Sequence, residues 1–267
     1  EGWKAGDSPL SDEKLALKRN TPQLNHIAAF SDDVRDGLKG SVFDHPDRGF
    51  ASAKPNMEES VKFGVVASTQ HPQINYEKVN YSNEPWAAQP SQAISYVSCH
   101  DNHTLWDRLI NSQPKASEFE RMDMAILANT VVLTSQGIPF LHAGVEMLRT
   151  KDGEENSYKS PDTINKLDWS RKTTYPQVFD TYKKLIQLRK NHPAFRMPTT
   201  KMIQQHLKFM DFPEGSLLVG YTISGNANGD SWQDILVVFN GNQVDKPVDI
   251  PAGVWTMVGR GGDVDEA

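Results

Sequence analysis

The feature that most constrains the fold of this chain is an apolar alternating run that ends abruptly in polar residues. Residues Ala93 to Cys99 have the pattern of a buried strand, and His100 and Asp101 follow directly. In α/β barrels, side chains at the carboxyl ends of the strands form the active site. The pattern therefore indicates a strand that delivers an imidazole and a carboxylate to a site. The alternative is that Asp101 only caps the next segment and His100 is a hydrogen-bonded core residue.

Strands and helices alternate through the first two thirds of the chain. Further short buried strands are predicted at Ile27–Phe30 and Ile138–Ala143, and the segment from Val34 to Pro55 is expected to be a long loop. Apolar residues at helical spacing, with start and stop signals, predict helices over about Met57–Ala67, capped by Asn56, over Phe119–Gln136, and over Pro176–Arg189.

The pattern changes to short β-like runs separated by turn signals in the last quarter of the chain. The predicted strands are Met202–Met210, Ser216–Ser224, Asp234–Asn240, Pro247–Ile250 and Val254–Val258. This pattern favours an antiparallel β-sandwich, although the chain ends before such a sandwich has its usual number of strands. We therefore expect an α/β domain over residues 1–191 and an incomplete β-sandwich over 192–267.

Composition excludes several partners and cofactors. The formal net charge of -6, with no basic run, argues against nucleic acid or an anionic membrane surface, and a neutral substrate fits better. The single cysteine, Cys99, precludes an internal disulfide or a cluster of thiolate ligands, and we expect it to be a small buried apolar residue. No stretch reaches the length of a transmembrane helix.

Two blocks of sequence carry a family resemblance. The twelve residues Tyr96–Asp107, YVSCHDNHTLWD, closely resemble the last conserved region of type I pullulanases, debranching members of the α-amylase superfamily. The second block, residues 137–151, is GIPFLHAGVEMLRTK, and it is followed by Asn156-Ser157-Tyr158, Ser160-Pro161-Asp162 and Leu167-Asp168-Trp169. The resemblance runs from the first residue to about His192 and continues more loosely through the β-rich tail.

The resemblance implies a fold of mixed α/β and all-β parts. The three early strands would be the sixth, seventh and eighth of a TIM (β/α)8 barrel, followed by the family's C-terminal β-sandwich domain. Three strand–helix units cannot close an eight-stranded barrel, and an open edge strand favours association. We therefore expect a chain truncated at both ends, whose partner is the missing N-terminal half of the barrel.

The resemblance also implies roles for individual residues. Glu1 would be the general acid, Trp3 would stack on glucose, Asp101 would stabilise the transition state, and His100 would hydrogen-bond the same glucose. In the loop after the eighth strand, three residues would contact sugar hydroxyls: Arg149, Asn156 and Tyr158. The open alternatives are a disordered terminus for Glu1, a core position for Trp3 and a network within the loop for the other three.

The implied reaction is retaining hydrolysis of α-1,6-glucosidic branches in pullulan, branched maltooligosaccharides and related α-glucans. Retention requires a second carboxylate, a nucleophile about 5 Å from the acid. The family places that aspartate on the fourth barrel strand, before Glu1, so this chain is expected to be inactive alone. The alternatives are a noncatalytic carbohydrate-binding fragment, and an α-1,4-acting amylase or a bifunctional amylopullulanase.

No metal site is predicted from the acidic residues of the loops. Asp152, Glu154 and Glu155 lack the regular ligand spacing of a calcium loop, and acids near Asp32 are expected to form salt bridges in a solvated loop. The resemblance implies no required cofactor and is compatible with a structural calcium ion. It favours a secreted or cell-envelope protein, which no segment of the sequence decides.

Overall fold

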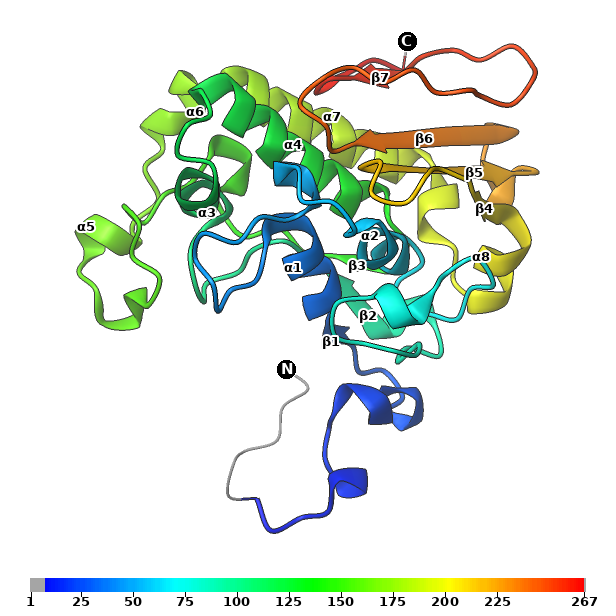
Figure 1. The fold of residues 1–267 in the computed structure, drawn as a ribbon, viewed down its shortest axis with the longest axis horizontal. Coiled ribbons are helices and arrows are strands. Elements are labelled where there is room, and N and C mark those ends of the chain that lie inside the picture. The colour runs from blue at the N-terminus through cyan, green and yellow to red at the C-terminus, as the bar shows by residue number, and fades with distance from the viewer. Residues whose placement is uncertain (1–7, 267) are drawn as a thin grey trace.

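A short parallel sheet lies within the first part of the molecule. The computed structural model describes residues 8–266, and its parallel strands are β1 (Ala29–Phe30), β2 (Ala93–Ser95) and β3 (Ile138–Pro139), with β2 in the centre (Figure 1). The three predicted α/β strands are therefore confirmed as parallel neighbours in chain order. Each is shorter than predicted; beyond β2 the side chains of Tyr96, Val97 and Ser98 stay buried although the residues lie outside the ladder.

The described residues contain eight α-helices. They are α1 (Asp32–Lys39), α2 (Glu58–Val65), α3 (Leu105–Ser112), α4 (Glu118–Thr134), α5 (Asp162–Asn165), α6 (Ser170–Thr174), α7 (Pro176–Asn191) and α8 (Thr200–His206). Short 3-10 turns lie at Asp12–Lys14, Lys18–Gln23, Phe50–Ser52, Tyr76–Lys78, Pro90–Gln92, Val145–Met147, Ser157–Lys159, Pro193–Arg196 and Ala227–Gly229.

Helices α2, α4 and α7 confirm the helical spacing. Helix α4 begins at a capping box in which the Ser117 amide donates to Glu120 Oε2 over 2.6 Å and the Glu120 amide donates to Ser117 Oγ over 3.2 Å. Helix α7 begins with Pro176 in its first turn and ends before the Pro193 turn. The predicted cap of α2 was wrong, since Asn56 has a φ of 64° and Met57 precedes the helix.

Helix α1 corrects the prediction of a long loop after the first strand. Val34 and Leu38, one turn apart, are fully buried, and so is the acid Asp33. Asp33 Oδ1 accepts hydrogen bonds from the amides of Tyr81 and Ser82, at 2.9 and 3.0 Å. Buried acids on one face hid the helical period from the sequence pattern. The predicted salt bridges are present, at Asp32–Arg35 and Arg35–Asp36.

The C-terminal part contains a small antiparallel sheet in the order β4 (Leu207–Phe209), β5 (Leu218–Ser224) and β6 (Asp234–Asn240). Strands β5 and β6 pair from Leu218 opposite Asn240 to Ser224 opposite Asp234, so both predicted strands are confirmed. A separate two-stranded hairpin pairs β7 (Gly259–Arg260) with β8 (Asp263–Val264).

Three predictions for this part were wrong. The run 202–210 is the end of α8 followed by the short β4, because Thr199 Oγ1 caps the helix by accepting from the Met202 amide at 3.2 Å. Residues 247–250 and 254–258 form no strand, and Val254 is completely exposed. The sheet of β4, β5 and β6 and the β7–β8 hairpin are separate sheets, and the sandwich stays a prediction.

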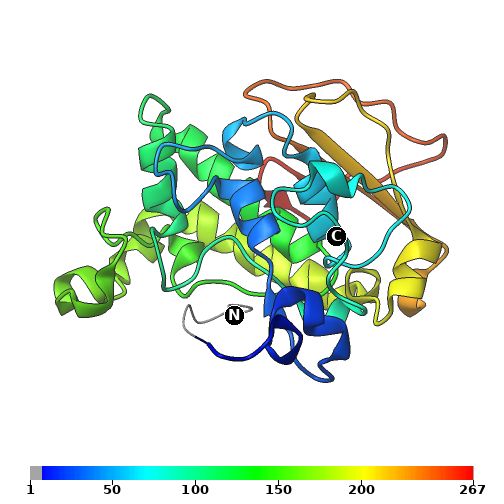
Figure 2. The ribbon, with the colours of Figure 1, turned by 60° about the horizontal axis from the view of Figure 1, so that its bottom comes forward.

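The two sheets share one hydrophobic core, with helices α2 and α4 between them (Figures 1 and 2). Tyr221 Oη on β5 donates to the Thr134 carbonyl at the end of α4 over 2.8 Å, and the Leu217 amide donates to Glu58 Oε1 on α2 over 2.8 Å. The helices thereby join the antiparallel sheet to the α/β part.

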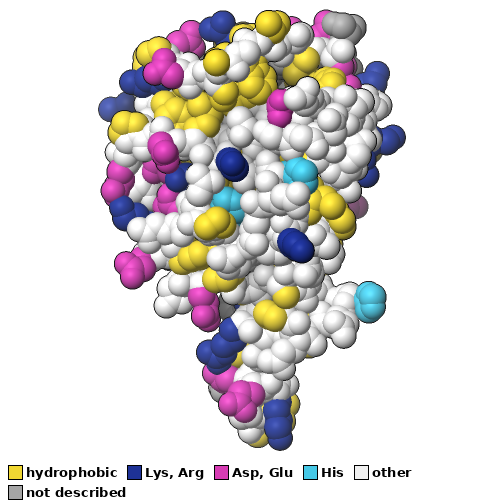
Figure 3. Space-filling view, turned by 90° about the vertical axis from the view of Figure 1, so that its right-hand side faces the viewer, with side chains coloured by type: hydrophobic (Ala, Val, Ile, Leu, Met, Phe, Trp, Pro, Cys, Tyr) yellow, Lys and Arg dark blue, Asp and Glu magenta, His cyan; other side chains and the backbone are white. Residues whose placement is uncertain are grey.

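The surface differs between the two ends of the molecule. Figure 3 shows apolar side chains gathered at one end and a narrow, charged opposite end formed by the first described residues. The C-terminal segment contributes exposed Val244, Ile250, Val254 and Met257. Among the described helices, none combines the length and apolar character needed to cross a bilayer.

Candidate functional site

His100 and Asp101 follow β2 and face solvent. Their side chains are 85% and 57% exposed, and His100 Nε2 lies 3.3 Å from Asp101 Oδ1. The alternative that Asp101 caps the next helix is wrong, because Thr104 Oγ1 accepts from the Asp107 amide at 3.1 Å and caps α3. His100 is likewise not a core residue. The structure therefore presents an accessible imidazole–carboxylate pair at the carboxyl edge of the parallel sheet.

The backbone on both sides of Asp101 is held by a buried lysine. Lys151 is 2% exposed, and its Nζ donates to the carbonyls of His100 and Asn102, at 3.1 and 2.8 Å, and to Ser157 Oγ at 3.1 Å. Asn102 has a φ of 63°, in the left-handed region that asparagine tolerates. Burial and the neighbouring Arg149 lower the pKa of Lys151. The Asp101 carboxylate is thus exposed on a fixed backbone.

Asp107 connects the same loop to the one after β3. It is 2% exposed, its Oδ2 accepts from the Lys151 amide at 2.8 Å, and its Oδ1 accepts from Thr150 Oγ1. Sequence reasoning assigned no role to Asp107 or Lys151. The available signal was their position, since each is the last residue of one of the two blocks that carry the family resemblance.

Arg149 forms hydrogen bonds within its own loop, which was the alternative to sugar contact, and its predicted contact with sugar hydroxyls stays a prediction. Its Nη1 lies 3.1 Å from His142 Nε2 and donates to the Ala143 carbonyl at 3.1 Å, and its Nη2 donates to the Asn165 carbonyl at 2.8 Å. Burial, with a further contribution from Arg149, lowers the pKa of His142 to about 4. The imidazole is therefore neutral at pH 7 and accepts the arginine hydrogen bond.

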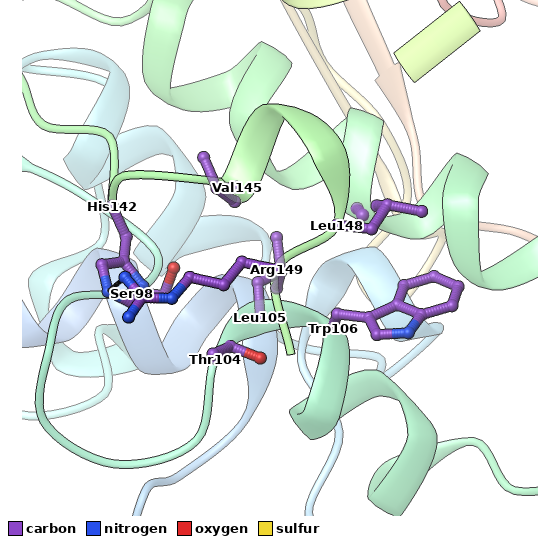
Figure 4. Close-up of a pocket in the computed structure, with 9 residues that line it drawn as sticks. Ser98, Thr104, Leu105, Trp106, His142, Val145, Leu148 and Arg149 are labelled. Atoms are coloured by element: carbon purple, nitrogen blue, oxygen red, sulfur yellow. Dashed lines mark hydrogen bonds between the residues drawn. The ribbon is translucent and has the colours of Figure 1, made fainter. Parts of the chain in front are cut away.

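Arg149 and His142 meet Ser98 at one side of a narrow pocket, and Trp106 forms the opposite side (Figure 4). The lining residues are Ser98, Thr104, Leu105, Trp106, Ala125, His142, Val145, Leu148 and Arg149. Ser98 Oγ and Arg149 Nε are buried with no hydrogen-bond partner among the residues that the structure describes. The pocket is too narrow to admit a water molecule, so these two polar atoms stay unpaired in the structure.

The other predicted site residues make fewer contacts or lie outside the described residues. Tyr158 is 74% exposed, and its ring centroid lies 5.1 Å from Lys159 Nζ. Asn156 is exposed, and its backbone N–H donates to Glu154 Oε1 at 3.0 Å. Both belong to the loop that also carries Lys151. Glu1 and Trp3 lie outside the described residues, so their predicted convergence with Asp101 stays a prediction.

One further group of side chains has the chemistry to hold a metal ion. His45, His103 and Glu155 each offer a ligand atom, and these atoms lie within 4.8 Å of one another. Sequence spacing could not reveal this group, because its members come from three separate loops. Cys99, expected to be buried, is partly exposed and has no place in it.

Comparison with known proteins gives a consistent result. Residues 203–263 match the family described as "Pullulanase, all-beta domain". The pullulanase of Bacillus subtilis strain 168 is 37% identical over 238 residues, which are 89% of this chain and 32% of that protein.

Solved structures agree over nearly the whole chain. The pullulanase from Bacillus acidopullulyticus matches with a TM-score of 0.90 and 40% identity, covering 100% of this chain and 31% of that one. A pullulanase from Paenibacillus barengoltzii, in complex with maltohexaose and α-cyclodextrin, matches with a TM-score of 0.86 and 42% identity, covering 94% and 37%. The chain spans about a third of the length of these relatives.

Proposed function

Because the chain belongs to the pullulanase family of glycoside hydrolases, we propose that the intact protein hydrolyses α-1,6-glucosidic branches in pullulan and related α-glucans with retention. In this proposal β1, β2 and β3 are the sixth, seventh and eighth strands of a (β/α)8 barrel. The remaining barrel strands and the aspartate nucleophile then belong to a part of the intact protein outside these 267 residues.

The observation that carries the proposal is the Asp101 loop. An exposed carboxylate sits on a backbone fixed by the buried Lys151 ammonium, with His100 beside it, at the edge where barrel enzymes place their chemistry. Sugar hydroxyls are neutral donors that pair well with an ionised carboxylate. The complex of the Paenibacillus barengoltzii pullulanase with maltohexaose supports an α-glucan as the ligand.

The proposed chemistry divides the work between acids. Glu1 protonates the departing oxygen, and the nucleophile from outside this chain attacks the anomeric carbon to form the covalent glucosyl-enzyme. Asp101 and His100 bind hydroxyls of the distorted ring more tightly in the transition state than in the ground state, and this differential binding raises the rate. Water activated by Glu1 then releases the product.

Substitution of Asp101 in the intact protein tests this role. We expect Asp101→Asn to lower kcat for pullulan by about 10²- to 10³-fold, because the amide keeps the size of the side chain and loses the charge. Asp211→Asn, at an exposed aspartate on the loop between β4 and β5, is the matched control and should leave kcat unchanged. Maltotriose release from pullulan, compared with cleavage of amylose, separates α-1,6 from α-1,4 activity. An unchanged kcat in Asp101→Asn would refute the role.

The isolated chain provides a second test. We expect no pullulan hydrolysis by purified 267-residue protein in a reducing-sugar assay, because double displacement requires the nucleophile. Calorimetry with maltohexaose on the same sample measures binding separately. Robust turnover by material of verified mass would contradict the division of the site.

A further inference from the structure

Three loops that are far apart in the sequence bring His45, His103 and Glu155 together. His45 lies after α1, His103 after β2 and Glu155 after β3, and His45 Nε2 is 2.6 Å from Glu155 Oε2. The rings of His45 and His103 meet edge to face with centroids 4.7 Å apart. We call these three residues the His–His–Glu cluster.

Each loop of the His–His–Glu cluster is fixed by buried hydrogen bonds. The Arg108 guanidinium, 1% exposed, donates from Nη2 to the carbonyls of Ser41, Asp44 and Asp47 at 2.6, 2.7 and 2.8 Å, which shapes the loop around His45. Lys151 and Asp107 hold the other two loops together. The ligand atoms are therefore delivered by a preformed frame, which lowers the ordering cost of binding an ion.

The side chains on this frame are suited to accept an ion. His103 is 5% exposed, and Asn111 Nδ2 lies 3.2 Å from its Nε2, which fixes the ring. The side chains of His45 and Glu155 are 45% and 43% exposed, which leaves an entry path from solvent.

The donor set indicates the class of ion. Two imidazole nitrogens and one carboxylate match the three-ligand zinc sites that leave a fourth position for water, whereas calcium and magnesium prefer sites built from oxygen. Zinc binds nitrogen and oxygen at about 2.0–2.2 Å, so two ligands of one tetrahedral ion lie about 3.3–3.6 Å apart. The largest separation in the His–His–Glu cluster, within 4.8 Å, closes when each side chain shifts by less than about 1 Å.

We propose that the His–His–Glu cluster is a binding site for a zinc-class divalent transition-metal ion. The bound ion links the loop after α1 to the loops after β2 and β3, and so braces the segment that carries Asp101. This site does not depend on the proposed glucan chemistry, because none of its ligands is assigned to sugar binding.

Calorimetric titration of the 267-residue chain with ZnCl₂ tests the proposal. We expect one ion per chain, binding at least about tenfold weaker in His45→Asn and in Glu155→Gln. Both substitutions are at partly exposed positions, so folding is retained, and circular dichroism checks this. His26→Asn and Glu154→Gln are the controls, since they remove an exposed imidazole and an exposed neighbouring carboxylate. Both controls should bind zinc as the parent chain does.

One spectroscopic and one thermal measurement complete the test. Co²⁺ added in place of zinc should give visible absorption typical of four- or five-coordinate cobalt, lost in both ligand variants. Zinc should raise the thermal midpoint of the parent chain and of the controls only. The proposal is overturned if the parent chain binds no zinc, or if the ligand variants bind it as tightly as the parent.

Discussion

The carboxyl edge of the parallel sheet and the antiparallel sheet are held together by different means. Strands β5 and β6 have seven residues each and pair at every position, so the backbone ladder itself maintains that region. Strands β1 to β3 have only two or three residues, and the loops beyond them are held by buried charged side chains. A region that must present functional groups in loops thus relies on specific donors in place of a ladder.

Arg108 and Lys151 are the buried donors that hold these loops in place of a backbone ladder. Besides its three Nη2 bonds, Arg108 donates from Nε to the Lys39 carbonyl at 3.2 Å, while Lys151 donates to two carbonyls around Asp101. Buried carbonyls that lose such donors are costly, since water cannot replace the hydrogen bonds. We therefore expect that replacing one buried polar side chain lowers the free energy of unfolding most in the loops at the carboxyl edge of the parallel sheet.

The largest effect is expected for Arg108→Met. It leaves the Lys39 carbonyl at the end of α1 and three loop carbonyls without their donor, and the free energy of unfolding should fall by about 3–5 kcal/mol, measured by urea denaturation. Arg260→Met is the matched control, because that guanidinium is 71% exposed beside Asp245, and it should change the free energy by less than about 1 kcal/mol. Similar losses in the two variants would contradict the view that buried donors stabilise the loop edge.

A pH dependence should arise from His142 at the same edge. Its folded pKa of about 4 lies below the ordinary 6.5, so the unfolded chain binds more protons between these values. This contribution to stability is present above pH 6.5 and lost as pH falls toward 4, by up to about 3 kcal/mol.

Urea denaturation of His142→Gln at pH 7.5 and pH 4.5 isolates that contribution. The glutamine oxygen can still accept from Arg149 but does not titrate, so the variant should lose less stability on acidification than the parent chain. His26→Asn, at an exposed histidine, should lose as much stability between pH 7.5 and pH 4.5 as the parent chain. Equal acid sensitivity of His142→Gln and the parent chain would count against the lowered pKa.

The smallest effect is expected for Tyr221→Phe in the antiparallel sheet. It removes the 2.8 Å hydrogen bond to the Thr134 carbonyl and leaves the β5–β6 ladder intact, so it should cost about 1 to 1.5 kcal/mol. Tyr158→Phe, at a ring that is 74% exposed, should be neutral within about 0.5 kcal/mol. A loss for Tyr221→Phe equal to that for Arg108→Met would show that both regions depend on single donors.

Local patterns were sufficient where one face of an element is apolar. The β-like runs of β5 and β6, bounded by turn signals, and the helical spacing in α4 and α7 predicted those elements nearly to their ends. The same approach missed α1, because Asp33 and Asp36 are buried among polar partners, and it assigned the run at 202–210 to a strand although Thr199 starts a helix there. Local periodicity fails when tertiary hydrogen bonds satisfy polar groups in the core.

The candidate site divides in the same way. His100 and Asp101 were identified from their position directly after an apolar run, and the structure places them at the sheet edge. The supporting role of Lys151 depends on carbonyls 49 and 51 residues away, and that of Arg108 on carbonyls 61 to 69 residues away. Such partners leave no local spacing to read.

Local patterns and two matched blocks of residues were enough to order the strands, to identify the family and to locate the His100–Asp101 pair. The bracing of the loops and the meeting of His45, His103 and Glu155 became visible in the folded chain. The physical reason is that a hydrogen bond or a metal ligand set requires atoms within a few ångströms, and for segments distant along the chain only the folded core sets that proximity.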